Sequence, residues 1–389
     1  MDNHTATSYM INNSILQILE KLISFESVTP KSANSIEYIA DFLSKIGFKC
    51  EIKKFDSGKE ETTNLYAILG HSSPNICFAG HVDVVPPMNE NLWKYDPFKM
   101  TIQDDIVYGR GVVDMKGSIA CYLSAISEFL KNHKEYKGSI SLLLTSDEEG
   151  DAKYGTQKML EHIKDYTPKV DFCILGEPTS KNKIGDTVKI GRRGSVNFTL
   201  KVIGKQGHVA YPKKAINPIP FMIRILNDLS GYEFDKGSEY FQQSNLEITS
   251  VDTGNPVTNV IPESVSTMFN IRFNDKHTSE SLTEDVIKII EDHGVKYDLQ
   301  YKSSSTSFIQ EYSPIMQDFV QVIKDVCGIT PNVTTCGGTS DARFIHSYSD
   351  VIELGLDCNL AHKINESSKI SDLQALHKVY YDSLVKFML

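Results

Sequence analysis

No run of apolar residues in the sequence approaches the length of about 20 that a membrane span requires. The first residues, MDNHTATSYM, lack the charged and apolar regions of a secretory signal. Long basic runs are absent as well, and the formal net charge is -10. These features argue against a membrane or a nucleic acid as the main partner. We therefore expect a cytoplasmic protein in which local cations meet any small anionic substrate.

Cysteine pairs are also missing. The seven cysteines are an odd number and are scattered along the chain without a CxxC motif. This distribution favours neither a disulfide framework nor a thiolate zinc site, so most of the thiols are expected in the core. With 40% hydrophobic residues, the 389-residue chain can form two or perhaps three packed domains.

The chain does contain alternating helical and extended patterns. Apolar spacing predicts helices near 15–23, 36–46 and 117–131, and strand-like runs occur at 63–69, 74–80, 139–145 and 171–175. This alternation is typical of an α/β sheet.

A different order of elements begins near residue 191. The predicted elements are strand 194–203, helix 216–230, strand 244–251, strand 264–273, helix 279–293 and strand 296–301. This βαββαβ order is that of a ferredoxin-like domain. A helix at 314–327 and a strand near 350–354 indicate a return to the first domain. We therefore expect a catalytic domain in two parts, 1–190 and 305–389, with 191–304 inserted between them.

Polar residues recur at the ends of the predicted strands. In FAGHVDVVP, His81 and Asp83 follow an apolar run that has Gly80 as its close-approach point, and a period of two places both side chains on one face. Open α/β sheets place their sites at this edge. The other residues of this kind are Asp114, in a turn that opens a helix, Asp147, Glu148, Glu149, Glu177, His362 and Glu366. Singly, each could be a helix cap or a solvated acidic residue.

Taken together, these side chains predict a metal site. Isolated buried carboxylates are costly, but a divalent cation makes such a cluster favourable. Imidazole and carboxylate ligands without cysteine suit zinc or a similar first-row metal. Two imidazoles and at least three carboxylates favour two adjacent ions that share a bridging carboxylate. The alternative is a structural polar cluster.

The motifs GHVDVVP, GRGVVDMKG, TSDEEG, GEPT and GKQGHVAYP resemble those of the zinc-dependent aminoacylase and carboxypeptidase superfamily, over nearly the whole chain. GRRGS, TNVIP, NIRF, GGTSDARF and AHKINE resemble its desuccinylase branch. The resemblance implies an α/β catalytic domain with a central mixed sheet flanked by helices, and an inserted ferredoxin-like domain that serves as lid and dimerisation surface. It also implies a homodimer with two Zn²⁺ ions per subunit, of which Co²⁺ can replace one.

The resemblance further implies a role for each matching residue. Asp114 would bridge the two ions, with His81 and Glu177 completing one site and Glu149 and His362 the other. Asp83 would accept the second N–H of His81, and Glu148 would be the general base. His208 would stabilise the oxyanion in the other subunit, although on its motif alone it could be a turn residue. The implied substrate-binding residues are Arg192, Ser195, Tyr211, Asn259, Arg272, Gly338 and Thr339.

The implied reaction converts N-succinyl-LL-2,6-diaminopimelate to succinate and LL-2,6-diaminopimelate, a step in lysine and peptidoglycan precursor synthesis. Such a substrate carries several carboxylates, which arginines bind with paired N–H donors. Two departures from the branch leave other substrates open: Cys358 stands where an asparagine is usual, with Asn359 one place later, and Ala342 replaces a glycine. A one-residue loop shift could restore the asparagine contact.

Three alternatives to this reaction follow. Two keep the chemistry and change the substrate: another N-acyl-amino-acid deacylase, such as an acetylornithine deacetylase, or a dipeptidase. The third is an inactive relative that acts as a binding or assembly protein. Such a protein would be marked by loss of a metal ligand or of the base, and neither is lost here.

Overall fold

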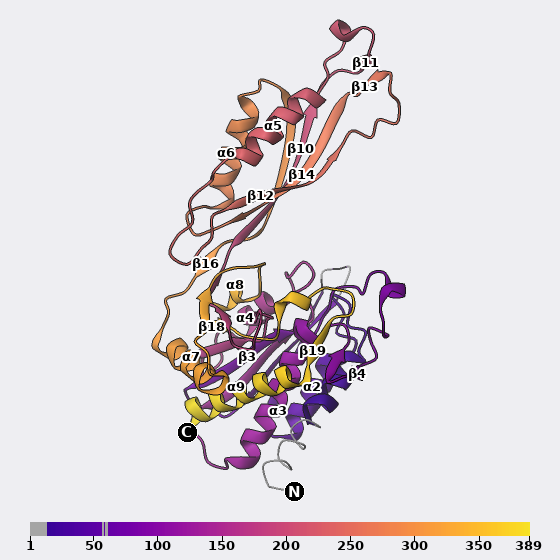
Figure 1. Ribbon diagram of the computed structural model, residues 1–389. Coiled ribbons are helices and arrows are strands. Elements are labelled where there is room, and N and C mark those ends of the chain that lie inside the picture. Colours follow the sequence, from indigo (N-terminus) through magenta and orange to yellow (C-terminus); the bar gives the residue numbers. More distant parts are fainter. Residues whose placement is uncertain (1–13, 57, 59–60) are drawn as a thin grey trace. The chain divides into compact units, whose positions relative to one another are not determined.

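A computed structural model describes residues 14–56, 58 and 61–389, which form two compact units (Figure 1). Unit 1 contains the described residues up to Ile190 together with Gln310–Thr334 and Ser340–Leu389, and unit 2 contains Gly191–Ile309 and Thr335–Thr339. The sequence had assigned 305–309 and 335–339 to the catalytic domain. They belong to unit 2 because β16 (Phe308–Ile309) pairs with β9 (Gly191–Arg192), and the Thr335 hydroxyl donates to the Tyr240 carbonyl.

Unit 1 is built on an eight-stranded mixed sheet, which confirms the expected α/β class. The strand order is β1 (Lys49–Asp56), β2 (Glu61–Leu69), β6 (Ser139–Thr145), β3 (Asn75–His81), β7 (Phe172–Leu175), β18 (Asp350–Glu353), β8 (Thr187–Lys189) and β17 (Asn332–Thr334). At its centre β3 is parallel to both β6 and β7, whereas β2 is antiparallel to β1 and β6. The carboxyl ends of β6, β3 and β7 therefore lie along one edge.

Helices cover both faces of this sheet. Residues 14–23 are helical, and the other α-helices of unit 1 are α2 (Ser35–Lys45), α3 (Gly117–Asn132), α4 (Thr156–Ile163), α7 (Pro314–Cys327), α8 (Ala342–Ile345) and α9 (Ile370–Met388). On β3, Phe78 stacks on Tyr122 of α3 and packs edge-on against Tyr380 of α9. Its neighbour Cys77 faces α4 on the opposite side, because successive side chains of a strand alternate between faces.

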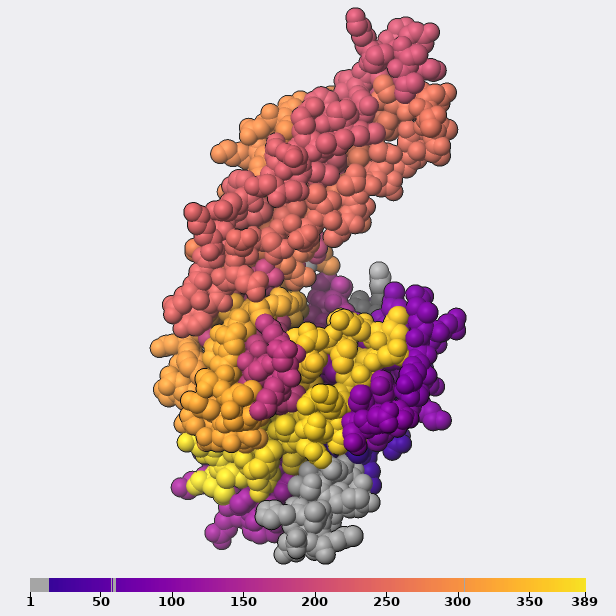
Figure 2. Space-filling view, viewed as in Figure 1, coloured from indigo at the N-terminus to yellow at the C-terminus, as the bar shows by residue number. Residues whose placement is uncertain are grey.

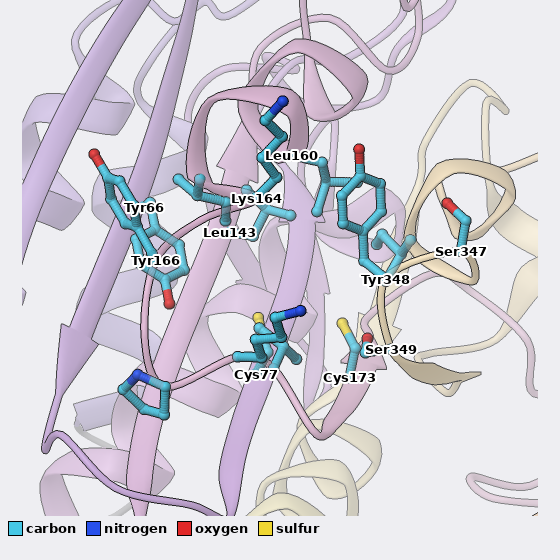
Figure 3. A pocket seen from close by; sticks show the side chains of 15 residues that line it. Tyr66, Cys77, Leu143, Leu160, Lys164, Tyr166, Cys173, Ser347, Tyr348 and Ser349 are labelled. Carbon is cyan, nitrogen blue, oxygen red and sulfur yellow. The ribbon is translucent and has the colours of Figure 1, made fainter.

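The α4 side of the sheet contains a cavity of about 230 Å³. Its wall includes Cys77 and Cys173 on adjacent strands, with Leu160 of α4 and the rings of Tyr66 and Tyr166 above them (Figure 3). None of the lining residues is among those predicted for the site. The polar residues predicted for the site therefore gather elsewhere in unit 1.

A small three-stranded sheet joins the C-terminal segment to an earlier part of unit 1. It contains β4 (Thr101–Gln103), β5 (Ile106–Tyr108) and β19 (Ser367–Lys369), with β5 in the centre. In the space-filling view the yellow C-terminal segment lies beside the purple segment that contains β4 and β5 (Figure 2). This pairing brings residues 361–366 next to residues 109–114.

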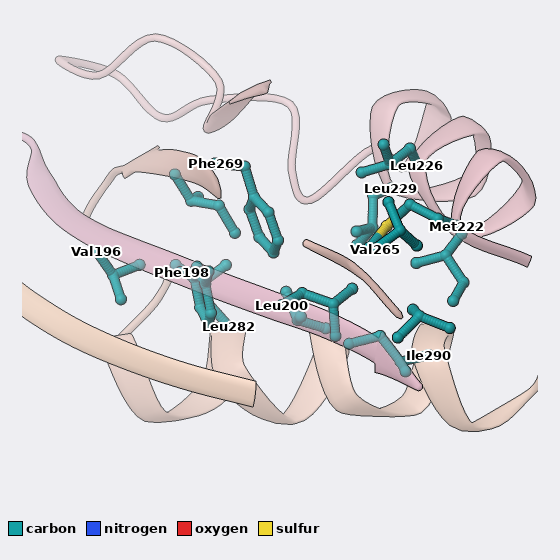
Figure 4. Close-up of a cluster of buried hydrophobic side chains, with 14 of the residues drawn as sticks. Val196, Phe198, Leu200, Met222, Leu226, Leu229, Val265, Phe269, Leu282 and Ile290 are labelled. Atoms are coloured by element: carbon teal, nitrogen blue, oxygen red, sulfur yellow. The ribbon is translucent and has the colours of Figure 1, made fainter. Parts of the chain in front are cut away.

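Unit 2 has the predicted ferredoxin-like order. Its antiparallel sheet runs β12 (Asn245–Asp252), β14 (Ser264–Phe273), β10 (Gly194–Ile203) and β15 (Lys296–Ser305), and its long helices are α5 (Ile219–Gly231) and α6 (Ser279–Glu291). Alternate residues of β10 are buried, and Phe198 stacks on Phe269 in a core to which both helices contribute side chains (Figure 4). Burial of each such ring contributes about 1.5–3 kcal/mol, so unit 2 has its own core.

Among the described residues, no helix is both long and apolar enough to cross a bilayer.

Candidate metal centre

Three neighbouring strands of unit 1 bring polar residues to one edge of the sheet. β3 ends at His81, β6 is followed by Asp147, Glu148 and Glu149, and β7 is followed by Glu177. The strand bodies are fully buried, so the first positions at which charged groups can gather are just beyond their carboxyl ends.

A turn between β5 and α3 brings Asp114 to the same edge. The turn occupies Val112–Lys116, and Met115 within it packs against β3. A Cβ added to Gly80 would collide with Met115 Cε, so the absence of a side chain at Gly80 allows this approach. The prediction that Gly80 is a point of close approach is confirmed.

The first group of possible metal ligands is His81, Asp114 and Glu177, all buried. His81 Nε2 lies 3.1 Å from Asp114 Oδ1 and 3.6 Å from Glu177 Oε1. On the other side of the ring, Nδ1 donates to the main-chain carbonyl of Asp83 at 2.9 Å. Because a carbonyl only accepts, Nδ1 carries a proton. Nε2 faces the carboxylates, so it donates to Asp114 when the ring is protonated and can offer its lone pair to a metal ion when the ring is neutral.

The second group is Asp114, Glu149 and His362. His362 Nε2 lies 3.1 Å from Asp114 Oδ2 and 2.8 Å from Glu149 Oε1. Asp114 thus faces His81 with one oxygen and His362 with the other. This is the arrangement in which a single carboxylate can serve two metal ions.

The electrostatics of both groups fit a cation. Hydrogen bonds to Asp114 and Glu149 raise the pKa of His362 to about 10. Burial alone would raise the pKa of Asp114, but hydrogen bonds from His362 and His81 outweigh it and lower that pKa. The negative carboxylates thus favour protonated, positively charged imidazoles at both positions. A divalent ion supplies the same charge and displaces those protons.

Asp83 orients different groups from those expected. Its carboxylate Oδ1 lies 3.7 Å from His81 Nδ1, too far for a hydrogen bond, and its main-chain oxygen accepts that proton instead. The carboxylate accepts the N–H of Glu149 at 3.1 Å and that of Glu148 at 3.4 Å. Through backbone and side chain together, Asp83 links the end of β3 to the loop after β6.

Glu148 has an environment suited to proton transfer. The residue is half-buried, and burial together with the nearby Glu177 carboxylate raises its pKa well above the ordinary value. The charge of His81 partly opposes this increase. A carboxylate whose proton affinity has been increased is a better base at neutral pH.

The residues predicted to bind substrate are all in unit 2, where they form two groups. Arg192, Ser195 and Arg272 lie near the first residues of β10, with Ser195 and Arg272 directly opposite each other on β10 and β14. The Arg192 guanidinium donates to the Gly338 carbonyl at 2.9 Å, which places Gly338 and Thr339 with this group. Arg272 is half-buried near Arg193, and neither forms an ion pair with a carboxylate of the described residues.

The other group lies around β11 (Gly207–His208) and β13 (Val260–Ile261), at the end of unit 2 opposite β16 (Figure 1). His208, Tyr211 and Asn259 are exposed there, and the rings of His208 and Tyr211 are 5.8 Å apart. Nδ1 of His208 accepts the N–H of Ala210 at 3.1 Å. The proton of the neutral ring is therefore on Nε2, which faces outward as a donor.

Two residues given no role by the sequence are also part of the centre. Glu366 stands in the motif AHKINE, and its buried carboxylate pairs with Arg110 at 2.8 Å. Its position four residues after His362 was the available signal. Arg110 stands in the motif GRGVVDMKG, but its partner is more than 250 residues away along the chain, so the pairing had no local signal.

Comparison with known proteins assigns the chain to a class of hydrolases. The model of peptidase family M20/M25/M40 matches residues 77–386, and the chain belongs to this family. Among its relatives are two proteins named succinyl-diaminopimelate desuccinylase. The protein from Rickettsia bellii is 54% identical over 95% of both chains, and that from Rickettsia felis is 54% identical over 96% of this chain and 100% of the relative. The resemblance to the desuccinylase branch is confirmed.

Solved structures share the fold at low sequence identity. An M20 family metallo-carboxypeptidase from Sulfolobus solfataricus superposes with a TM-score of 0.78 at 19% identity, covering 96% of this chain and 98% of the other. Human carnosine dipeptidase 1 gives a TM-score of 0.75 at 18% identity, covering 97% of both chains.

Proposed function

We propose that this protein hydrolyses N-succinyl-LL-2,6-diaminopimelate to succinate and LL-2,6-diaminopimelate, with two Zn²⁺ ions held at the candidate metal centre. The observation that carries the proposal is the shared Asp114, whose two oxygens face His81 and His362 in two separate ligand groups. The substrate assignment is supported by relatives that are 54% identical and carry the desuccinylase name.

The donor set fits zinc. His81, Glu177 and Asp114 would hold one ion, and Glu149, His362 and Asp114 the other. Co²⁺ accepts the same ligands, and we expect it to replace zinc at one site. When bound, such ions polarise the amide carbonyl and make a water molecule more acidic.

Glu148 would transfer the proton. It would take one from the attacking water and deliver it to the amide nitrogen as the C–N bond breaks. The new oxygen would leave in the succinate carboxylate, and the amine of diaminopimelate would carry the transferred proton. Support comes from the raised pKa of Glu148 and from Asp83, which holds the backbone of Glu148 and Glu149 in place.

The substrate carboxylates would be bound in unit 2. Arg192 and Arg272 would supply charge, and Ser195, Tyr211, Asn259, Gly338 and Thr339 hydrogen bonds. Arg272 is the best-supported of these residues because it lies near Arg193 without a carboxylate partner among the described residues, so a bound anion would relieve repulsion between two cations.

We propose a homodimer formed through unit 2, in which His208 serves the metal centre of the partner. Support for the role of His208 comes from the N–H of Ala210, which occupies Nδ1 and leaves Nε2–H as the donor. A donor aimed at the developing oxyanion is worth several kcal/mol in transition-state stabilisation, on the order of 2.7–4 kcal/mol.

A second candidate function is hydrolysis of another N-acyl amino acid, such as acetylornithine. It is favoured by one observation: the side-chain amide of Asn359 donates to the Lys181 carbonyl at 2.6 Å. Asn359 is thus already engaged and does not replace the asparagine that the branch usually has at position 358.

The test is a comparison of substrates with the zinc-reconstituted enzyme. We expect kcat/KM for N-succinyl-LL-2,6-diaminopimelate to exceed that for N-acetylornithine and for dipeptides by at least an order of magnitude. A preference for acetylornithine would establish the second candidate instead. Failure of the fully metallated protein to hydrolyse any of these amides would point to a binding protein.

A further inference from the structure

The carboxylate of Glu366 is completely buried and accepts four hydrogen bonds from one turn. Oε2 accepts from Arg110 Nη1 at 2.8 Å and from the N–H of Gly111 at 2.9 Å. Oε1 accepts from the N–H groups of Val113 at 2.7 Å and Asp114 at 3.1 Å. Each oxygen thus has two donors, which is its full capacity.

The turn requires such an acceptor. Gly111 has a φ of 84°, and Asp114 and Met115 have non-helical backbone angles, so the N–H groups here are not all paired within the turn. Buried N–H groups that lack a partner cost about 1–3 kcal/mol each. The Glu366 carboxylate inside the turn accepts three of these N–H groups. One of the three belongs to Asp114, so this hydrogen bond sets the direction of the Asp114 backbone.

The segment that carries Glu366 also carries His362. Arg110 Nη1 donates to the Lys363 carbonyl at 3.2 Å as well as to Glu366, and the N–H of Gly109 donates to the Glu366 carbonyl at 3.1 Å. His362 itself has a φ of 62°, an uncommon conformation for a residue with a side chain. The contacts around Glu366 therefore join the His362 segment to the Asp114 turn.

We infer that Glu366 is a positioning residue that fixes Asp114 relative to His362 before any metal binds, and that it thereby sets the affinity for the ion held between them. The inference rests on the proposed function only in taking the two ligand groups as metal sites. It concerns no contact between Glu366 and the substrate or an ion.

Glu366→Gln separates positioning from general stability. The glutamine has the same shape, but its NH₂ group must face two of the four donors, so two of the four hydrogen bonds are lost. A matched control is Asp235→Asn in unit 2. The Asp235 carboxylate is also buried and accepts the N–H groups of Gly237 at 2.6 Å and Ser244 at 3.1 Å. Neither of the two groups of possible metal ligands found among the described residues includes a residue of that unit.

Zinc affinity is measured by competition with a chromophoric chelator, and the ligand geometry by the visible absorption of the Co²⁺-substituted protein. We expect Glu366→Gln to weaken binding of one ion by about 10–100-fold, the range for residues that orient metal ligands. The Co²⁺ spectrum should change, and at saturating zinc kcat should fall with little change in KM. Asp235→Asn should leave zinc affinity and spectrum unchanged.

A folded Glu366→Gln protein with wild-type zinc affinity and Co²⁺ spectrum would overturn the inference. If that variant does not fold, amide exchange of the metal-free wild-type protein decides: the N–H groups of Gly111, Val113 and Asp114 should be protected. Exchange at the rate of exposed amides would overturn it. A wild-type protein that binds two zinc ions but does not cleave the succinyl substrate would refute the proposed function and leave this inference standing.

Discussion

At the scale of single residues, the centre depends on which atom of each side chain faces which neighbour. Asp114 divides its two oxygens between two imidazoles, and Asp83 uses its main-chain oxygen for His81 and its carboxylate for the loop after β6. A change of one functional group therefore has a specific consequence. Substitutions that keep the shape of the side chain are the most informative.

Glu148→Gln should keep both zinc ions and lose activity. The amide fills the same space but cannot take a proton, and general base catalysis contributes on the order of 10²–10⁴-fold. The expected result is a fall of that size in kcat, with two zinc ions per chain by elemental analysis. Near-normal turnover by the fully metallated variant would remove Glu148 from the mechanism.

Arg272→Lys should weaken transition-state binding although the charge is kept. An ammonium group cannot reproduce the paired planar donors of a guanidinium. We expect a loss of roughly 1.5–3 kcal/mol, the scale of a hydrogen bond to a charged group, measured as the ratio of kcat/KM values. Arg224→Lys, on α5, is the control and should leave kcat/KM unchanged. An unchanged kcat/KM for Arg272→Lys as well would argue against contact between Arg272 and the substrate.

At the scale of elements, the position of the centre follows from how helices and strands pack. Phe78 of β3 contacts both α3 and α9, and β19, which directly precedes α9, pairs with β5. The packing of α9 therefore helps to hold the AHKINE segment against the Asp114 turn. Conditions that loosen α9 should lower the stability of unit 1.

Acid should loosen α9 through His377. This residue is buried, and burial lowers its pKa to about 4 even though Glu128 Oε2 lies 3.5 Å from Nε2. Because the unfolded chain takes up the proton near pH 6.5 and the folded chain only near pH 4, stability is complete above pH 6.5 and is lost as the pH falls toward 4. The contribution lost between pH 7 and pH 5 is about 2 kcal/mol.

The measurement is the free energy of unfolding by urea of metal-free protein at both pH values, followed by a signal from unit 1. His377→Gln, which does not titrate, should have a smaller difference between pH 7 and pH 5 than the wild type by about 2 kcal/mol. Equal differences for the two proteins would mean that His377 is protonated at pH 5 in the folded state.

At the scale of the whole molecule, the possible metal ligands lie in unit 1 and the predicted substrate residues in unit 2. If both sets of predicted roles hold, metal binding and substrate binding fall in different units of the fold. The proposed homodimer adds a further division, since His208 would act in the partner's site.

A mixed dimer tests this division. His208→Ala and Glu148→Gln should each inactivate a homodimer, because every site then lacks one group. In a mixed dimer with two-fold symmetry, both defects fall in one site and the other site is intact. Random co-assembly in equal amounts should recover about a quarter of wild-type activity. Isolation of the mixed dimer with two tags and detection of no activity above the parents would show that His208 serves its own chain.

Much of the site was predictable from sequence because local patterns encode it. The apolar run of β3 predicted His81 at a strand end, and the order of elements after residue 191 predicted the ferredoxin-like unit. The residue types predicted a metal centre without thiolates, since clustered imidazole and carboxylate groups bind divalent metal ions. Family motifs extended this to individual roles, which stay predictions until the experiments above are done.

Other features were decided only by tertiary structure. The small sheet that contains β19 and the long helix α9 were not predicted, and the boundary of unit 2 moved because β16 pairs with β9. The choice of oxygen on Asp83 and the burial of Glu366 against Arg110 depend on segments that are far apart in the chain. Periodicity reflects near neighbours, whereas these contacts exist only once distant backbone groups meet and each buried donor must find an acceptor.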